Sequence, residues 1–91
     1  GILLDIVQAN QQALTMRVLE AIYLSKKLIT NNPYIADYDF YHPNNILILP
    51  ATWDDSIIPI IQDFMQKPFV PYSDEILYNY SYEHWRDSFT S

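Results

Sequence analysis

The sequence predicts a helix-dominated α+β domain with the element order α-β-β-α-α. Three observations predict it: a helical apolar pattern over 2–30, two short extended runs around a turn over 37–49, and two capped helical patterns after residue 54. Because a two-stranded hairpin is only marginally stable in water, an all-α bundle with an extended loop is the alternative. At 91 residues, the chain is expected to form one small domain, 1–91.

The start of the chain indicates a piece of a longer protein. Gly1 stands where an initiator methionine would be, and we interpret it as a residue left by cloning. The residues that follow are already in the middle of an apolar pattern. We therefore expect a domain excised from a longer chain or trimmed at its N-terminus.

A long first helix is predicted over residues 2–30. Glycine and proline are absent between Ile2 and Asn32, and Lys26 and Lys27 suit the negative end of a helix dipole. The apolar residues recur three or four positions apart, or at multiples of these spacings, and include Leu3, Val7, Leu14, Val18, Ala21 and Leu28. Such a helix would be about 43 Å long and would project beyond a domain of this size.

The projecting N-terminal end is the predicted oligomer interface. It is apolar on almost every side, so that it requires cover from a second copy, from the parent chain or from a partner. We expect a homodimer, because two-fold symmetry is the commonest closed arrangement. The interface residues are predicted to be Ile2, Leu3, Ile6 and Val7.

A β-hairpin is predicted over DYDFYHPNNILILP, residues 37–50. Polar and aromatic residues alternate over 37–41, His42-Pro43-Asn44-Asn45 has turn chemistry, and 46–49 is an apolar run that ends before Pro50. The pairing would join 37–41 to 46–49. Ile46 and Ile48 would then share one face and Leu47 and Leu49 the other, with at least one face packed on a helix.

Two shorter helices are predicted in the C-terminal half. The first begins near Asp54, with Ser56 as its N-cap, and ends at Lys67-Pro68. The second covers 74–89 after Ser73, although residues 76–85 also alternate as a strand would. Its apolar face would consist of Tyr78, Tyr82, Trp85 and Phe89.

Charge and composition exclude several classes of function. Residues 1–30 carry a balance of +1 and residues 31–91 one of −7, so nucleic acid and anionic membranes are not expected partners. The chain has no cysteine, and no apolar run is long enough to span a bilayer. We expect neither disulfides nor thiolate metal sites, and the sequence leaves the localisation open.

Two clusters have residue types that could carry chemistry. Asp37, Asp39 and His42 could ligate a metal, and the segment 83–87, with His84 between acids, could serve acid–base catalysis. Ordinary surface side chains explain both clusters more simply. Because Gly1 is the only glycine, phosphate-binding loops and dinucleotide fingerprints are excluded. The sequence therefore predicts no catalytic residues, no metal site, no cofactor and no enzyme.

The aromatic content favours protein binding. Eight tyrosines are more than a domain of this size can bury completely, although a core of tyrosines whose hydroxyls reach water is an alternative. We expect a non-enzymatic protein–protein interaction domain with an acidic-aromatic surface and a basic partner. A small acidic inhibitor, immunity protein or antitoxin that blocks a basic site is the alternative. The predicted partner-binding residues are Asp37, Tyr38, Asp39, Phe40, Tyr41 and Tyr80.

Overall fold

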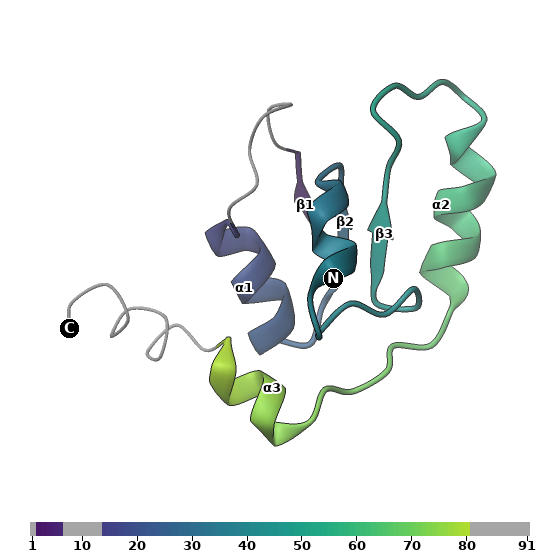
Figure 1. The fold of residues 1–91 in the computed structure, drawn as a ribbon. Coiled ribbons are helices and arrows are strands. Elements are labelled where there is room, and N and C mark those ends of the chain that lie inside the picture. Colours follow the sequence, from purple (N-terminus) through teal and green to yellow (C-terminus); the bar gives the residue numbers. More distant parts are fainter. Residues whose placement is uncertain (1, 7–13, 81–91) are drawn as a thin grey trace.

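A computed structural model describes residues 2–6 and 14–80. It is a small α+β fold in which a parallel sheet lies between helix α1 and helix α2 (Figure 1). In chain order, the elements are β1 Ile2–Asp5, α1 Met16–Tyr23, β2 Lys27–Thr30, the 3-10 helix η1 Pro33–Asp37, β3 Ile46–Ile48, α2 Ile57–Gln66 and α3 Asp74–Asn79.

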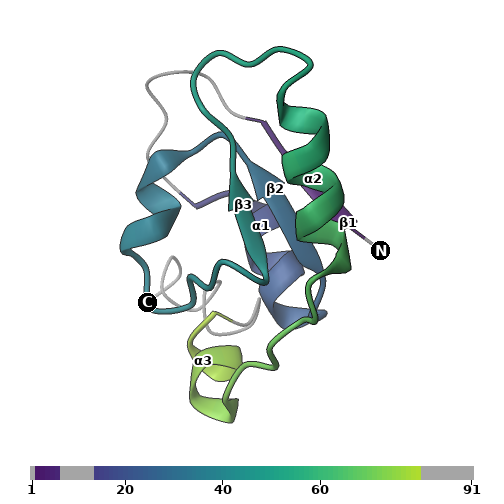
Figure 2. The same ribbon diagram turned by 90° about the vertical axis from the view of Figure 1, so that its right-hand side faces the viewer.

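The sheet has three strands in the order β1-β2-β3, and both pairs are parallel. Leu3 lies beside Leu28, and Ile29 lies beside Leu47. Parallel neighbours require a crossover connection. The segment with α1 makes the first crossover, and the segment with η1 makes the second, so strands that are consecutive in sequence are neighbours in space (Figure 2).

The predicted long helix over 2–30 is wrong, because this stretch contains β1, α1 and β2. A strand buried on both faces is an uninterrupted apolar run, and a short run of this kind also satisfies a helical pattern. Helix α1 ends at Tyr23, and Ser25 then adopts a φ of 55° that turns the chain into β2. The lysine pair therefore lies at the start of a strand and not at the end of a helix.

The predicted antiparallel hairpin is also wrong, as is the all-α alternative. Residues 33–37 form η1, and β3 pairs in parallel with β2 instead of with 37–41. The turn itself is present, since the amides of Asn45 and Ile46 both donate to the carbonyl of His42 at 2.9 Å. Before it, the Tyr41 amide bonds to the Tyr38 carbonyl at 3.2 Å, which bends the segment that was expected to be extended.

The faces predicted for 46–49 are confirmed. Ile46 and Ile48 contact the cluster on the α1 side of the sheet, whereas Leu47 and Leu49 contact the cluster on the α2 side. The first cluster is built on Val18, Ala21, Ile22, Leu28, Ile35, Phe40 and Ile46, and the second on Ile29, Leu49 and Phe64. β2 and β3 are thus packed on both faces, as strands of parallel sheets generally are, whereas Ile2 and Leu4 of β1 are exposed on the face opposite α1.

Helix α2 has the predicted position, and Ser56 occupies the N-cap position as predicted. Its side chain makes no capping hydrogen bond, however, and Asp54 accepts from the Ser56 amide through Oδ1 at 2.9 Å. Along the helix, Phe64 is buried, whereas Ile58 and Met65 are exposed.

Helix α3 begins as predicted, with the Ser73 hydroxyl accepting from the Ile76 amide at 3.2 Å. The strand alternative for 76–85 is therefore wrong for residues 76–79, which belong to α3. The predicted apolar face is wrong where it can be compared, because Tyr78 is 64% exposed, while Ile76, Leu77 and Tyr80 contact the core. The remaining predicted positions Tyr82, Trp85 and Phe89, and the helix beyond residue 80, lie outside the described residues.

A buried carboxylate joins β1, α1 and β2. Asp5, at the end of β1, accepts from the Thr15 hydroxyl at 2.9 Å and from the Thr30 hydroxyl at 3.4 Å. Thr15 is also the N-cap of α1, since its Oγ1 accepts from the Val18 amide at 3.3 Å. The carboxylate thus lies close to the positive end of the helix dipole, where a negative charge is favoured.

Two further side chains attach the C-terminal half to the sheet. The Lys27 ammonium donates to the carbonyls of Phe64 and Lys67 and lies 4.6 Å from the centre of the Phe64 ring. It therefore ties the end of α2 to the start of β2, and it adds a second donor to the Phe64 carbonyl, which already accepts from the Lys67 amide at 3.2 Å. Burial and the charge of Lys67 lower the pKa of Lys27. The buried Asn45 side chain exchanges two 2.8 Å hydrogen bonds with the backbone of Val70, which holds the connection to α3.

Replacing Asp5 with Ala is expected to lower the free energy of unfolding by about 1–3 kcal/mol, because the two threonine hydroxyls lose their buried acceptor. Thr15→Val should cost about 1 kcal/mol through loss of the cap and of one of these bonds. Chemical denaturation measures both. Asp63→Asn is the matched control: its side chain is 72% exposed and meets Lys67 at 3.5 Å, so its effect should stay within about 0.5 kcal/mol. An equal loss in the control variant would contradict the assignment.

Candidate functional site

The structure brings together most of the predicted partner-binding residues, but it uses their aromatic rings internally. Phe40 is 1% exposed, stacks on Tyr38 at 5.1 Å between ring centres and meets the edge of Tyr80 at 4.8 Å. The Tyr80 hydroxyl donates to Asp39 Oδ1 at 2.7 Å. Tyr41 is half-buried against the same core, and Asp37 is exposed at the end of η1. This cluster packs α3 onto the domain.

His42, considered above as a metal ligand, has a local role in the turn. Its Nδ1 accepts from the Asn44 amide at 3.0 Å, and its carbonyl accepts the two amides that close the turn. Within 2–6 and 14–80, no three His, Asp or Glu side chains gather as a metal site would require. The second candidate, His84, lies outside the described residues.

The Tyr80–Asp39 pair predicts a loss of stability at alkaline pH. Burial, then the hydrogen bond to Asp39 and the charges of Asp39 and Tyr38, raise the pKa of Tyr80 to about 12. An unfolded tyrosine titrates near pH 10. A folded pKa above the unfolded one gives stability that is complete below pH ~10 and is lost as the pH rises towards ~12.

The measurement is the free energy of unfolding between these pH values for the wild type and Tyr80→Phe. The wild type should lose more stability than the variant, which cannot ionise at this position. Burial also raises the pKa of Tyr72, but both proteins share that contribution. Asp39→Asn should move the wild-type dependence to lower pH, because it removes the negative charge and leaves the ring buried. Parallel curves for wild type and Tyr80→Phe would show that the pair contributes nothing.

The surface that best fits the expected chemistry lies in the loop between β3 and α2. A hollow of about 300 Å³ opens there, and we name it the 50–60 cleft. Its lining residues are Pro50, Thr52, Trp53, Asp54, Ser56, Ile57 and Ile60. The loop follows the carboxyl end of β3 (Figure 1), and this end of a parallel sheet is where open α/β folds bind their ligands.

The 50–60 cleft combines an aromatic anchor with fixed negative charge. Trp53 is 46% exposed, although it is the largest side chain of the lining. Its neighbour Asp54 is oriented by the hydrogen bond from the Ser56 amide, and hydrogen bonds from Ser56 lower the pKa of this carboxyl. Asp55 adds a second exposed carboxylate. Indole and carboxylate side by side suit a cationic group from a partner.

Sequence reasoning treated this segment only as the start of a helix. The available signal was a tryptophan directly before two aspartates, in a loop that follows a proline. The signal was hidden because acids and a serine before an apolar run are equally typical of a helix N-terminus. Only the structure shows that the tryptophan stays at the surface.

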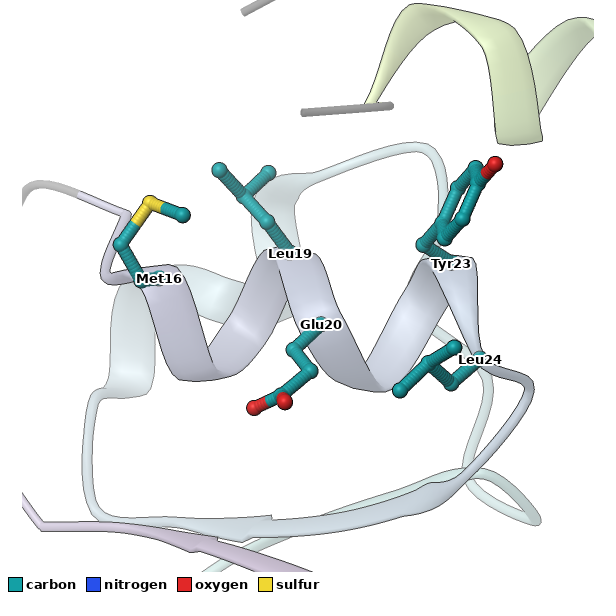
Figure 3. A pocket seen from close by; sticks show the side chains of 5 residues that line it. All are labelled: Met16, Leu19, Glu20, Tyr23 and Leu24. Carbon is teal, nitrogen blue, oxygen red and sulfur yellow. The ribbon is translucent and has the colours of Figure 1, made fainter. Parts of the chain in front are cut away.

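A second, more apolar hollow lies on the outward face of α1. It measures about 280 Å³, and its described lining residues are Met16, Leu19, Glu20, Tyr23 and Leu24 (Figure 3). Met16, Tyr23 and Leu24 are exposed, whereas Leu19 is buried. Glu20 is its only charged lining residue among those described, so this hollow offers less chemical selectivity than the 50–60 cleft.

The chain matches no known protein family, no curated protein and no solved structure. Among the residues that the structure describes, no helix combines the length and the apolar character that crossing a bilayer demands.

Proposed function

We propose that this chain is a non-enzymatic protein-binding domain that holds a basic segment of a partner protein in the 50–60 cleft. The observation that carries the proposal is the exposure of Trp53 beside the oriented, ionised Asp54. The acidic-aromatic recognition expected from the sequence is retained, but its place is the loop before α2. The rings of Tyr38, Phe40 and Tyr80, which the sequence placed in the binding surface, pack against one another instead.

Trp53 supplies the anchoring part of the proposed interaction. Tryptophan is enriched among the few residues that dominate binding energy at protein interfaces, because it buries a large rigid surface. Pro50 and Ile60 border the same hollow and offer an apolar rim. A partner side chain with an aliphatic stem, such as arginine or lysine, would cover the indole and place its charge over the ring.

Charge supplies the selective part. From residue 50 to 62 the chain carries Asp54 and Asp55 and no lysine or arginine. Carboxylates at the mouth of a cleft attract a cationic segment and repel an acidic one. The proposed ligand is therefore a peptide with arginine or lysine beside an apolar residue.

Selection from a displayed library of random linear peptides tests the proposal. The selected peptides should be enriched in arginine or lysine next to an apolar residue. Trp53→Ala should weaken their binding by at least about tenfold, which is the loss of a moderate interface hot spot. Asp54→Asn should weaken it by a smaller factor and reduce its dependence on salt, because the amide keeps the hydrogen bond from Ser56 but loses the charge.

Two matched variants control for general damage. Tyr23→Ala changes an exposed ring on α1, and Asp63→Asn changes an exposed acid on α2, and both should bind the selected peptides like the wild type. Equal binding by Trp53→Ala, or no enrichment of basic residues, would overturn the proposal. The alternative of a small acidic inhibitor uses the same chemistry. It predicts that a natural partner loses its own activity on binding, whereas a binding domain leaves that activity intact.

A further inference from the structure

The outer edge of β1 is an open β-strand edge with an apolar surface. Strand β1 ends the sheet, and within 2–6 and 14–80 no residue pairs with its outer side. On the face opposite α1, Ile2, Leu4 and Ile6 are exposed, and Leu4 is 55% exposed. On the other face, Leu3 contacts the core and Asp5 is buried.

Among the residues that the structure describes, this edge lacks the features by which proteins usually protect such strands. Edge strands are commonly guarded by outward lysines, prolines, bulges or a covering segment. The single charge of β1, Asp5, is turned inward and is bonded to Thr15 and Thr30. At the β3 end of the sheet, by contrast, Asn45 binds the backbone of Val70 and keeps a chain segment close by.

We propose that the outer edge of β1 pairs with β1 of a second copy, so that two sheets of three strands form one continuous sheet. An open edge specifies a β-strand as its occupant, because only a strand satisfies a row of backbone amides and carbonyls. A two-fold axis perpendicular to the sheet makes the two β1 strands antiparallel and keeps each face on its own side. The residues expected at the oligomer interface, Ile2, Leu3 and Ile6, then lie at the interface as part of a strand and its end and not as part of a helix. The fourth, Val7, lies outside the described residues.

The alternation of β1 fixes which registers a two-fold axis allows. Opposed residues must share a face, so an exposed apolar residue lies opposite another. With the axis at Leu4, each Leu4 faces its symmetry mate and each Ile2 faces Ile6 of the second copy. All three exposed side chains then form cross-strand pairs. No carboxylate faces another, since Asp5 lies opposite Leu3.

Charge favours a second copy at this surface over contact between the copies elsewhere. Each copy carries a formal net charge of −6, so association through an acidic surface would be repulsive. From Ile2 to Ile6 the only ionisable side chain is the inward Asp5. The edge of β1 is therefore a surface where two copies meet without opposing exposed charges.

The first experiment is light scattering behind a sizing column at high micromolar concentration. The wild type should show twice the monomer mass. Leu4→Lys should raise the dissociation constant by about tenfold or more, because it places two like charges directly opposite each other. Leu4→Thr keeps the β propensity and serves as the folding control. Leu24→Asp, in the hollow on α1, should leave the dimer unchanged.

The second experiment uses the lack of native cysteine in the chain. A cysteine at residue 4 would face its symmetry mate at a Cβ–Cβ distance of about 4.5–5.5 Å, close to disulfide range. Leu4→Cys should therefore form covalent dimers on mild oxidation. Ile58→Cys, at a position of α2 with 51% exposure, should not. The inference would be overturned if the wild type were monomeric. It would also be overturned if Leu24→Asp abolished the dimer while Leu4→Lys kept it, or if the two cysteine variants cross-linked equally. The peptide-binding tests use other residues and are decided separately.

Discussion

The carboxylate of Asp5 is the interaction on which the N-terminal half of the fold depends. It lies at the end of β1 and accepts hydrogen bonds from a hydroxyl at the start of α1 and from a hydroxyl at the end of β2. A buried carboxylate is costly unless such partners compensate it. Because it occupies the region in front of the α1 N-terminus, this end of the helix already has its negative charge. At the carboxyl ends of β1 and β2, Asp5 and Thr30 therefore serve to hold β1, α1 and β2 together.

Other side chains of the domain are also used for packing, and this determines which surfaces remain free to bind a partner. The rings of Tyr38, Phe40 and Tyr80 attach α3, and Asn45 attaches the segment that leads to it. In the loop between β3 and α2, the Asp54 hydrogen bond shapes the start of the helix but leaves Trp53 exposed. Tyr23, Tyr34 and Tyr78 are exposed as well, and Trp53 is the exposed ring that lines the 50–60 cleft beside Asp54.

The two proposed interactions use separate parts of the molecule. The 50–60 cleft follows β3, whereas the proposed dimer edge belongs to β1, and β2 lies between these strands. In a two-fold dimer the central pair of β1 strands would place the two clefts beyond the outer strands. Such a dimer would present two copies of the cleft, and two linked sites bind a partner with repeated basic segments more tightly than one site does.

The sequence by itself determined the elements whose signals are local. Helix α2 follows from its apolar spacing, the start of α3 follows from the Ser73 cap, the faces of 46–49 follow from strand alternation, and the turn at 42–45 follows from its residues. What only the tertiary structure decided was the pairing. ILLD and KLIT satisfy a helical pattern as well as a strand, and they become strands because their backbones pair with each other and β2 is packed on both faces. The direction of β3, the inward aromatic cluster and the exposure of Trp53 likewise depend on contacts between residues far apart in the chain, for which a single sequence carries no local signal.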